Sequence, residues 1–242
     1  MRKISFILLI LLGVQSVTAQ VNSSRVMEIV RQYDATMKSA QHPEGIQSII
    51  RKGLHTEGDE SFELTLTQKT PFKIRYDYTL NGVKTLIGYN GEIGWQRTQR
   101  GDEIAIRDYV LGGFDWLRQS ADLNGYLLRS LAGEGGVELS LEAQEVFEER
   151  AVNVIRASDR NKINIRYYLN TISYYLERIE VLDAEGNLLD QTNFSNYRLI
   201  EGIPVAFNIK NIKKGKTVSQ SSWSEVTINS TVYDFLFEKP KF

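Results

Sequence analysis

The sequence predicts a mainly β fold of the α+β type, an antiparallel sheet with two helices, and three features support this class. Apolar and polar residues alternate with a period of two over much of the chain after residue 46, which is typical of strands with one apolar and one wet face. Asn-Gly pairs at 81–82 and 90–91 separate such strands. Helical spacing of apolar residues is confined to residues 23–40 and 114–132.

Residues 1–19 are predicted to be a secretory signal peptide. Arg2 and Lys3 precede an apolar run from Ile4 to Val14 that is too short to cross a bilayer as a helix, and small residues precede a cleavage point after Ala19. The chain has no cysteine, so neither an attached lipid nor a disulfide is expected. We therefore expect residues 20–242 to form a single soluble domain in the bacterial periplasm, stabilised by its hydrophobic core.

The first helical segment, residues 23–40, is expected to be amphipathic. Its apolar residues follow helical spacing, and Pro43 and Gly45 mark its end. The spaced residues are Val26, Ile29, Val30, Tyr33 and Met37.

Two strands with clear alternation follow, at residues 61–68 and 71–80. Lys73, Arg75 and Asp77 alternate with the apolar residues of the second strand, so we expect these three side chains to point to solvent. The residues expected on the shared apolar face are Phe62, Leu64, Leu66, Phe72, Ile74, Tyr76 and Tyr78.

The stretch 86–98, LIGYNGEIGWQRT, is predicted to be a hairpin. Asn-Gly tolerates positive φ at both central positions of a type I′ turn, at 90–91 as at 81–82. A nucleotide-binding glycine loop would need a helix after the strand, and the pattern after Gly91 indicates another strand.

The second helical segment, residues 114–132, has a wide apolar side but is weakened by Asn124-Gly125. Strand patterns then continue to the C-terminus, which gives about ten antiparallel strands in all.

The residues that usually carry chemistry are sparse. The two histidines, His42 and His55, have no carboxylate placed in the sequence to orient them, and without cysteine they give no metal-ligand spacing. Gly-x-Ser-x-Gly is absent. We therefore predict no catalytic residue, no metal and no cofactor. The 29 basic and 30 acidic residues leave a net charge of −1, so there is no basic excess for nucleic acid.

A basic segment near residue 214 has two interpretations. Lys214-Gly215-Lys216-Thr217 resembles the end of a phosphate loop, but Lys210 stands where that motif requires glycine. A hairpin tip is the better interpretation. Its lysines keep a sheet edge soluble or form a docking patch for anionic head groups or a partner; they are Lys210, Lys213, Lys214 and Lys216.

Several short motifs, taken in order, resemble the LolA-like family of periplasmic carriers that sort lipoproteins to the outer membrane. They are the N-terminal amphipathic helix, the proline-led strand 70–76, the Asn-Gly turn and tryptophan of 89–95, residues 174–186, 194–198 and 202–204, Ile228-Asn229 and the closing 235–240. One position departs from the pattern, because Thr70 stands where the well-studied carriers have an arginine.

The resemblance implies a single strongly curved antiparallel sheet, an incomplete β-barrel with helices in its concave side. It implies a non-enzymatic, monomeric carrier for acyl chains of lipoproteins or other envelope lipids, which touches membranes transiently and works between an inner-membrane release complex and an outer-membrane acceptor. The alternative is a scaffold module on the same fold that engages a protein partner. The predicted cavity residues are Phe62, Leu64, Leu66, Phe72, Ile74, Tyr76, Tyr78, Leu86, Trp95, Trp116 and Leu127, with Trp95 near the rim.

Overall fold

The computed structural model describes residues 23–109, 116–134, 136–159 and 164–241. The predicted signal peptide lies outside these ranges. The chain groups into two compact units. Unit 1 combines the segment up to Thr36 with Tyr126–Leu189, and unit 2 combines Met37–Gly125 with the segment from Asp190 onward.

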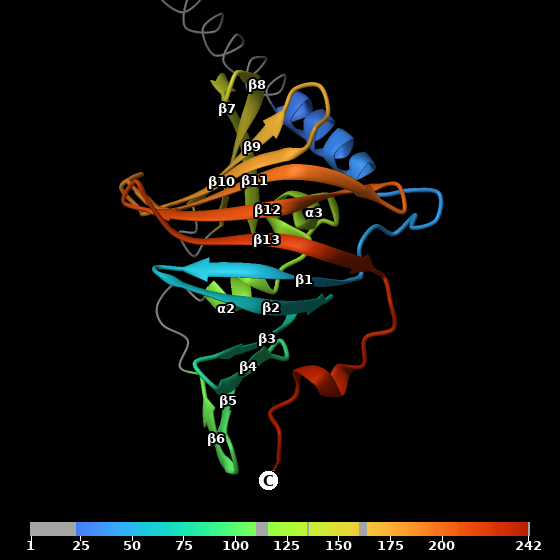
Figure 1. Cartoon of the computed structure of the whole chain (residues 1–242). Helices are drawn as coiled ribbons and strands as arrows, with labels where there is room; N and C mark the ends of the chain where they lie inside the picture. Colours follow the sequence, from blue (N-terminus) through green and yellow to red (C-terminus); the bar gives the residue numbers. More distant parts are fainter. Residues whose placement is uncertain (1–22, 110–115, 135, 160–163, 242) are drawn as a thin grey trace, which may run out of the picture. The chain divides into compact units, whose positions relative to one another are not determined.

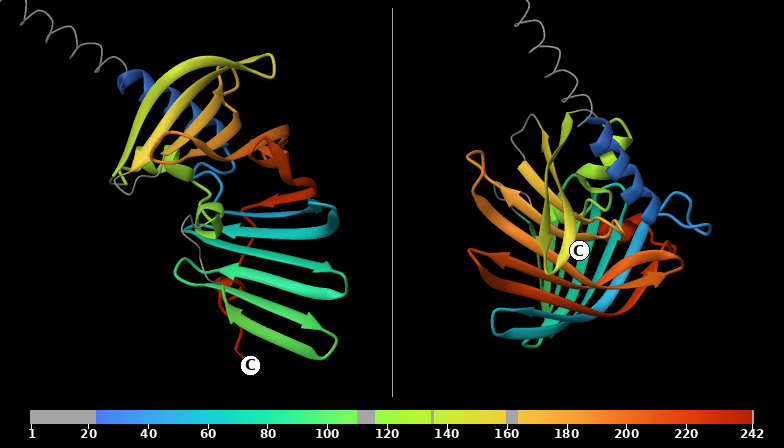
Figure 2. Two further views of the ribbon diagram at one scale, coloured as in Figure 1. Left: turned by 90° about the vertical axis from the view of Figure 1, so that its left-hand side faces the viewer. Right: turned by 90° about the horizontal axis from the view of Figure 1, so that it is seen from above.

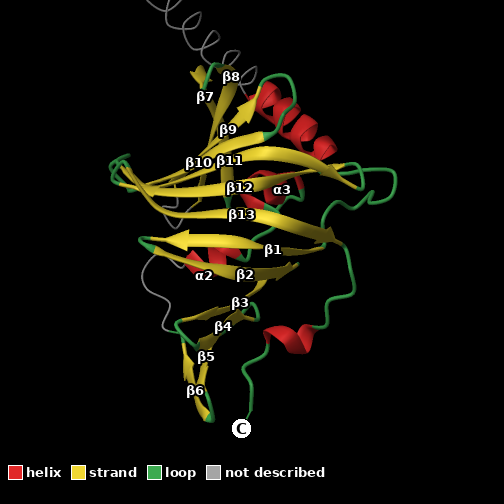
Figure 3. Ribbon diagram, in the orientation of Figure 1, coloured by secondary structure: helices red, strands yellow, loops and turns green. Residues whose placement is uncertain are grey.

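The strands form one antiparallel sheet of thirteen strands in the order β6-β5-β4-β3-β2-β1-β13-β12-β11-β10-β9-β8-β7. The sheet is not closed, since β6 and β7 stand at the two ends of this order. Strands make up most of the described chain (Figure 3). The predicted mainly β, antiparallel class is confirmed, with more strands than the sequence pattern indicated.

Unit 2 contains the strands of the N-terminal half and the last three strands of the chain (Figure 1). They are β1 (Ser48–Glu57), β2 (Glu60–Lys69), β3 (Lys73–Leu80), β4 (Val83–Tyr89), β5 (Gly94–Arg100), β6 (Glu103–Asp108), β11 (Leu188–Ile200), β12 (Ile203–Lys213) and β13 (Lys216–Ile228). A short helix, α2 (Trp116–Ser120), and a C-terminal 3-10 helix, η1 (Asp234–Phe237), complete it.

The two Asn-Gly pairs form different turns. Asn81 and Gly82 both have positive φ, 52° and 74°, and Leu80 pairs with Val83, so the predicted two-residue type I′ hairpin is confirmed. Between β4 and β5 the turn is longer than predicted. The Asn90 side-chain oxygen accepts hydrogen bonds from the N–H groups of Glu92 and Ile93, at 3.0 and 2.9 Å, which closes a loop over 90–93.

Unit 1 contains the N-terminal helix (residues 23–36), helix α3 (Gly125–Leu131) and four strands. The strands are β7 (Val137–Phe147), β8 (Arg150–Asp159), β9 (Asn164–Asn170) and β10 (Leu176–Leu182). The N-terminal helix runs beside these strands (Figure 2). It ends earlier than predicted, and its buried residues are the predicted Val26, Ile29, Val30 and Tyr33.

The second predicted helix is interrupted. Within 114–132 the structure has two short helices, α2 and α3, separated by residues 121–124. Gly125 adopts φ 59°, and its N–H donates to the Asp122 carboxylate at 3.0 Å, which starts α3 afresh. The helix that the sequence predicts over 114–132 is therefore broken just before Gly125, next to the pair expected to weaken it. No helix in the described part of the chain is long and apolar enough to span a membrane.

Candidate functional site

The predicted apolar face of β2 and β3 exists in unit 2. The strand register pairs Leu64 with Tyr78 and Leu66 with Tyr76, which puts these side chains on one side of the sheet. Helix α2 packs on the same side, since Leu117 and Ala121 belong to the same core cluster. We call this side the α2 face. Its cluster contains all seven predicted residues, Phe62, Leu64, Leu66, Phe72, Ile74, Tyr76 and Tyr78.

Burial along the α2 face changes from one end to the other. Leu64 is 4% exposed, Leu66 is 8% and Ile74 is 0%, so these side chains form a closed core. Two residues before Leu64, the ring of Phe62 is only half-buried, as is Tyr78. Large apolar side chains therefore continue along the face toward the hairpin tips, where they are only partly covered.

The half-buried end carries a row of rings across three strands. Phe62 stacks on Tyr78 with ring centroids 4.6 Å apart, and the His55 imidazole lies 5.2 Å from the Phe62 ring. His55 Nδ1 lies 2.8 Å from the hydroxyl of Ser221 on β13, and Ile209 of β12 stands opposite Ser221. We call these five residues the aromatic row. It is a mainly apolar strip that runs across β3, β2, β1, β13 and β12.

The Ser221–His55 contact also bears on catalysis. A serine activated by histidine needs a third group that orients the imidazole. Within the described residues no carboxylate bonds the other nitrogen of His55, and burial holds the pKa of this imidazole below its usual value. The pair therefore stands without the rest of a hydrolase triad.

A small polar cluster lies beneath α2 on the same face. The Arg51 guanidinium donates through Nη1 to the Gln68 side-chain oxygen, and Gln68 donates to the carbonyl of Ser120 at 2.6 Å. Burial lowers the pKa of Arg51 to about 10 and raises the pKa of Tyr76 to about 12. Sequence reasoning missed Arg51, although its alternation with Ile49 and Gly53 in β1 could have placed it on this face.

Two predicted cavity residues, Leu86 and Trp95, lie on the opposite face of the sheet, so their placement with the aromatic strands is wrong. Leu86 pairs with Asp77, and Trp95 pairs with Gly88, which stands opposite Arg75. The turn at 81–82 sets the face of Leu86, and the turn over 90–93, which has an even number of residues, keeps Trp95 on that same face. Both residues are buried in this opposite face.

The C-terminal segment covers that opposite face. Lys69 and Lys73 pair with Asp234 at 2.7 and 3.0 Å, and Arg75 Nη1 donates to the Leu236 carbonyl at 3.3 Å. Lys73, Arg75 and Asp77 were predicted to point to solvent. They are half-buried instead, with side chains 17%, 22% and 32% exposed, because the chain returns over them.

The remaining predicted site residues fall elsewhere. The side chain of Trp116 lies outside the described structure, and Leu127 is buried in α3 of unit 1. The predicted basic hairpin is present, with a turn at Lys214 and Gly215 between β12 and β13. All four predicted lysines are exposed, and Lys213 pairs with Asp190 at 3.2 Å.

His42 has a partner that the sequence did not suggest. Its Nε2 lies 2.5 Å from the carboxylate of Glu201, in the turn between β11 and β12. The expectation that no carboxylate orients either histidine is therefore wrong for His42. In the same turn Gly202 has φ 86° and approaches Ser39. The turn between β11 and β12 therefore contacts the loop after the N-terminal helix at both Ser39 and His42.

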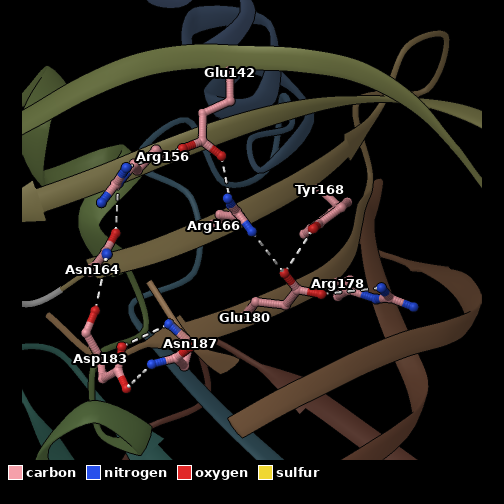
Figure 4. Close-up of polar contacts among 9 residues, drawn as sticks. All are labelled: Glu142, Arg156, Asn164, Arg166, Tyr168, Arg178, Glu180, Asp183 and Asn187. Carbon is pink, nitrogen blue, oxygen red and sulfur yellow. Dashed lines mark hydrogen bonds and ion pairs between the residues drawn. The ribbon is translucent and has the colours of Figure 1, made fainter. Parts of the chain in front are cut away.

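One face of β7–β10 in unit 1 carries a chain of alternating charges (Figure 4). Arg166 donates to Glu142 at 2.5 Å and lies 3.9 Å from Glu180, which also accepts hydrogen bonds from Tyr168 and Arg178 at 2.8 and 3.2 Å. Each of these two carboxylates has arginine partners. The arrangement stabilises a sheet face and offers no acid paired with a separate base.

A shallow cavity of about 270 Å³ lies between β1 and β13. Leu54 and Val218 supply its apolar part, and no titratable side chain lines it. In the described part of the chain, no group of three or more histidine or acidic side chains could hold a metal ion.

Comparison with known proteins gives matches at the level of the fold. No family model matches the sequence, and no curated protein matches it. Solved structures do. A LolA superfamily protein from Nitrosomonas europaea is 13% identical, with a TM-score of 0.60, over 88% of this chain and 96% of that one.

Two further structures match to a similar degree. A protein described as an outer membrane lipoprotein-sorting domain from Vibrio parahaemolyticus is 14% identical, with a TM-score of 0.59 over 90% and 98% of the two chains. A DUF1329 family protein from Desulfovibrio piger is 12% identical, with a TM-score of 0.59 over 90% and 97%. At these identities the likeness establishes the shared fold.

Proposed function

We propose that this protein is a periplasmic carrier that binds acyl chains of lipoproteins or other envelope lipids on the α2 face and moves them toward the outer membrane. The observation that carries the proposal is the aromatic row. Apolar side chains that are closed into a core under α2 continue as half-buried rings at Phe62 and Tyr78. Covering this strip with a hydrocarbon chain would remove apolar surface from water.

The architecture supports the same proposal. The fold is shared with a LolA superfamily protein and with a protein described as a lipoprotein-sorting domain. The export signal predicted in residues 1–19 would deliver the chain to the compartment where such cargo travels. The exposed lysines near Gly215 would meet anionic head groups or an acidic partner during brief contact.

Fatty acids of increasing length test the proposal. Each buried methylene contributes roughly 0.8 kcal/mol, so the dissociation constant should fall about fourfold per methylene until the strip is covered. Calorimetric titration with octanoate, dodecanoate and hexadecanoate measures this slope. Affinity that does not change with chain length would refute the carrier and favour a scaffold module that engages a protein partner.

A further inference from the structure

Two buried hydrogen-bond donors on the α2 face lack an acceptor within the described residues. They are Nε of Arg51 on β1 and Nε1 of Trp223 on β13. Buried polar groups in native proteins are nearly always hydrogen-bonded, and a buried donor left unpaired costs free energy. Two such donors on one face would be satisfied by an acceptor from outside the chain, either a water molecule or a ligand.

The strand register places these two donors near each other on the paired strands β1 and β13. Arg51 stands opposite Val226, and Gly53 stands opposite Trp223, with a bulge between the two pairs. The extra residue changes the parity of β13, so that Trp223 joins Ile228 in the core of the α2 face. Gly53 makes this possible, because a Cβ there would lie 2.1 Å from the Ser222 carbonyl.

The charge of Arg51 specifies the kind of acceptor. The described residues supply no carboxylate in hydrogen-bond or ion-pair contact with this guanidinium, whose Nη1 donates to the neutral side chain of Gln68. Gln68 is itself fixed on the Ser120 carbonyl, so the guanidinium is held in place. A positive charge on an apolar face is stabilised best by an anion that also accepts hydrogen bonds.

Resting on the proposed carrier function, we infer that the cargo is an anionic amphiphile. Its carboxylate or phosphate head group accepts hydrogen bonds from Arg51 Nε and Trp223 Nε1, while its hydrocarbon chain covers the aromatic row. Two members of the aromatic row lie on the same strands and the same face as these donors. His55 is two residues after Gly53 in β1, and Ser221 is two residues before Trp223 in β13. Head group and chain therefore bind neighbouring parts of one face.

The test compares ligands that share a chain and differ in the head group. Dodecanoate and dodecyl phosphate should bind wild-type protein at least about tenfold more tightly than dodecanol, as expected for hydrogen bonds to a charged group. Acetate and inorganic phosphate should bind too weakly to measure, because they bury no chain. Equal affinity for dodecanoate and dodecanol would overturn the inference and leave the carrier proposal standing.

Two variants locate the effect. Arg51→Met should bring dodecanoate and dodecanol to equal affinity, while dodecanol binding changes little. Trp223→Phe keeps the ring and removes the N–H, so it should reduce the preference for dodecanoate several-fold. Arg100→Met, an exposed arginine at the end of β5, is the matched control and should keep the full preference.

Three other outcomes are decisive. A preference retained in both Arg51→Met and Trp223→Phe would place the head group elsewhere and overturn the inference. Tight binding of acetate or phosphate alone would indicate an isolated anion site and would overturn the head-group assignment. Failure of every chain ligand, dodecanol included, would remove the carrier proposal as well.

Discussion

The indole Nε1 of Trp95 donates a 2.7 Å hydrogen bond to the main-chain carbonyl of Phe237, a residue 142 positions later in the chain. Both side chains are buried, Trp95 at 1% exposed and Phe237 at 0%. The C-terminal segment is therefore part of the core on the face opposite α2. This arrangement covers one face of the β3–β5 region with the chain's own C-terminal segment.

Replacing Phe237 tests the structural role of the C-terminal segment. Phe237→Ala should lower the free energy of unfolding by about 3–5 kcal/mol, because it leaves a cavity against Trp95. Phe235→Ala in the same 3-10 helix removes a ring that is 69% exposed and should change it by about 0.5 kcal/mol or less. Urea unfolding measures the free energy of unfolding of both variants. Equal losses would contradict the packing of the C-terminal segment against the sheet.

Reversing the charge of Arg75 tests the same face from the sheet side. The sequence alone predicts a nearly silent change, whereas the structure pairs Arg75 with Asp77 at 3.1 Å and with the Leu236 carbonyl. Arg75→Glu should therefore lower the free energy of unfolding by more than about 1 kcal/mol. Arg100→Glu, at an exposed position, is the control, and a silent Arg75→Glu would mean that the C-terminal segment does not cover this residue.

Alanine substitutions on the α2 face should separate core from ligand surface. Ile74 is wholly buried, so Ile74→Ala should lower the free energy of unfolding by about 2–5 kcal/mol. Phe62 is half-buried, so Phe62→Ala should weaken dodecanoate binding at least several-fold while unfolding changes less than in Ile74→Ala. Unfolding curves and titration of both variants decide, and a stability loss in Phe62→Ala without any loss of binding would identify an ordinary closed core.

The strands and the apolar face could be predicted from the sequence because alternation is a local property. Phe62, Leu64 and Leu66 share a face in any β-strand, as do Ile74, Tyr76 and Tyr78, and the turn over 70–72 between β2 and β3 brings the two sets to the same side of the sheet. A two-residue turn at Asn90-Gly91 and the observed four-residue turn over 90–93 both place Trp95 on the face opposite Tyr76 and Tyr78, because the two lengths differ by an even number of residues. The error at Trp95 follows from grouping it with the other aromatic residues by type and not by strand register.

Long-range contacts lay outside what the pattern could supply. Arg75 reads as a wet-face residue in its strand, and only the return of residues 234–238 over β3 makes it half-buried. The same holds for His42 and Glu201, which are 159 residues apart in the chain. The alternation of residues within β13 does not reveal the bulge that turns Trp223 toward the core. The one sequence feature at this place is Gly53 in the partner strand β1.

The half-buried imidazole of His55 makes stability depend on pH. Burial holds the folded-state pKa of His55 below its usual value of 6.5, so the unfolded chain takes up the proton first as pH falls. Stability from the neutral imidazole is complete above about pH 6.5 and is lost as the pH falls through the lower folded-state pKa. Thermal unfolding of wild type and His55→Gln between neutral and acidic pH should show a smaller decline in the variant, and identical declines would contradict this assignment.

Native mass spectrometry of the protein purified without detergent from its own host is the best test of whether the α2 face carries an acyl chain. We expect adducts whose masses match lipids or acylated peptides, reduced in Phe62→Ala and unchanged in Arg100→Met. A single peak at the mass of the bare chain for wild-type protein, under conditions that preserve lipid adducts on a known carrier, would contradict it.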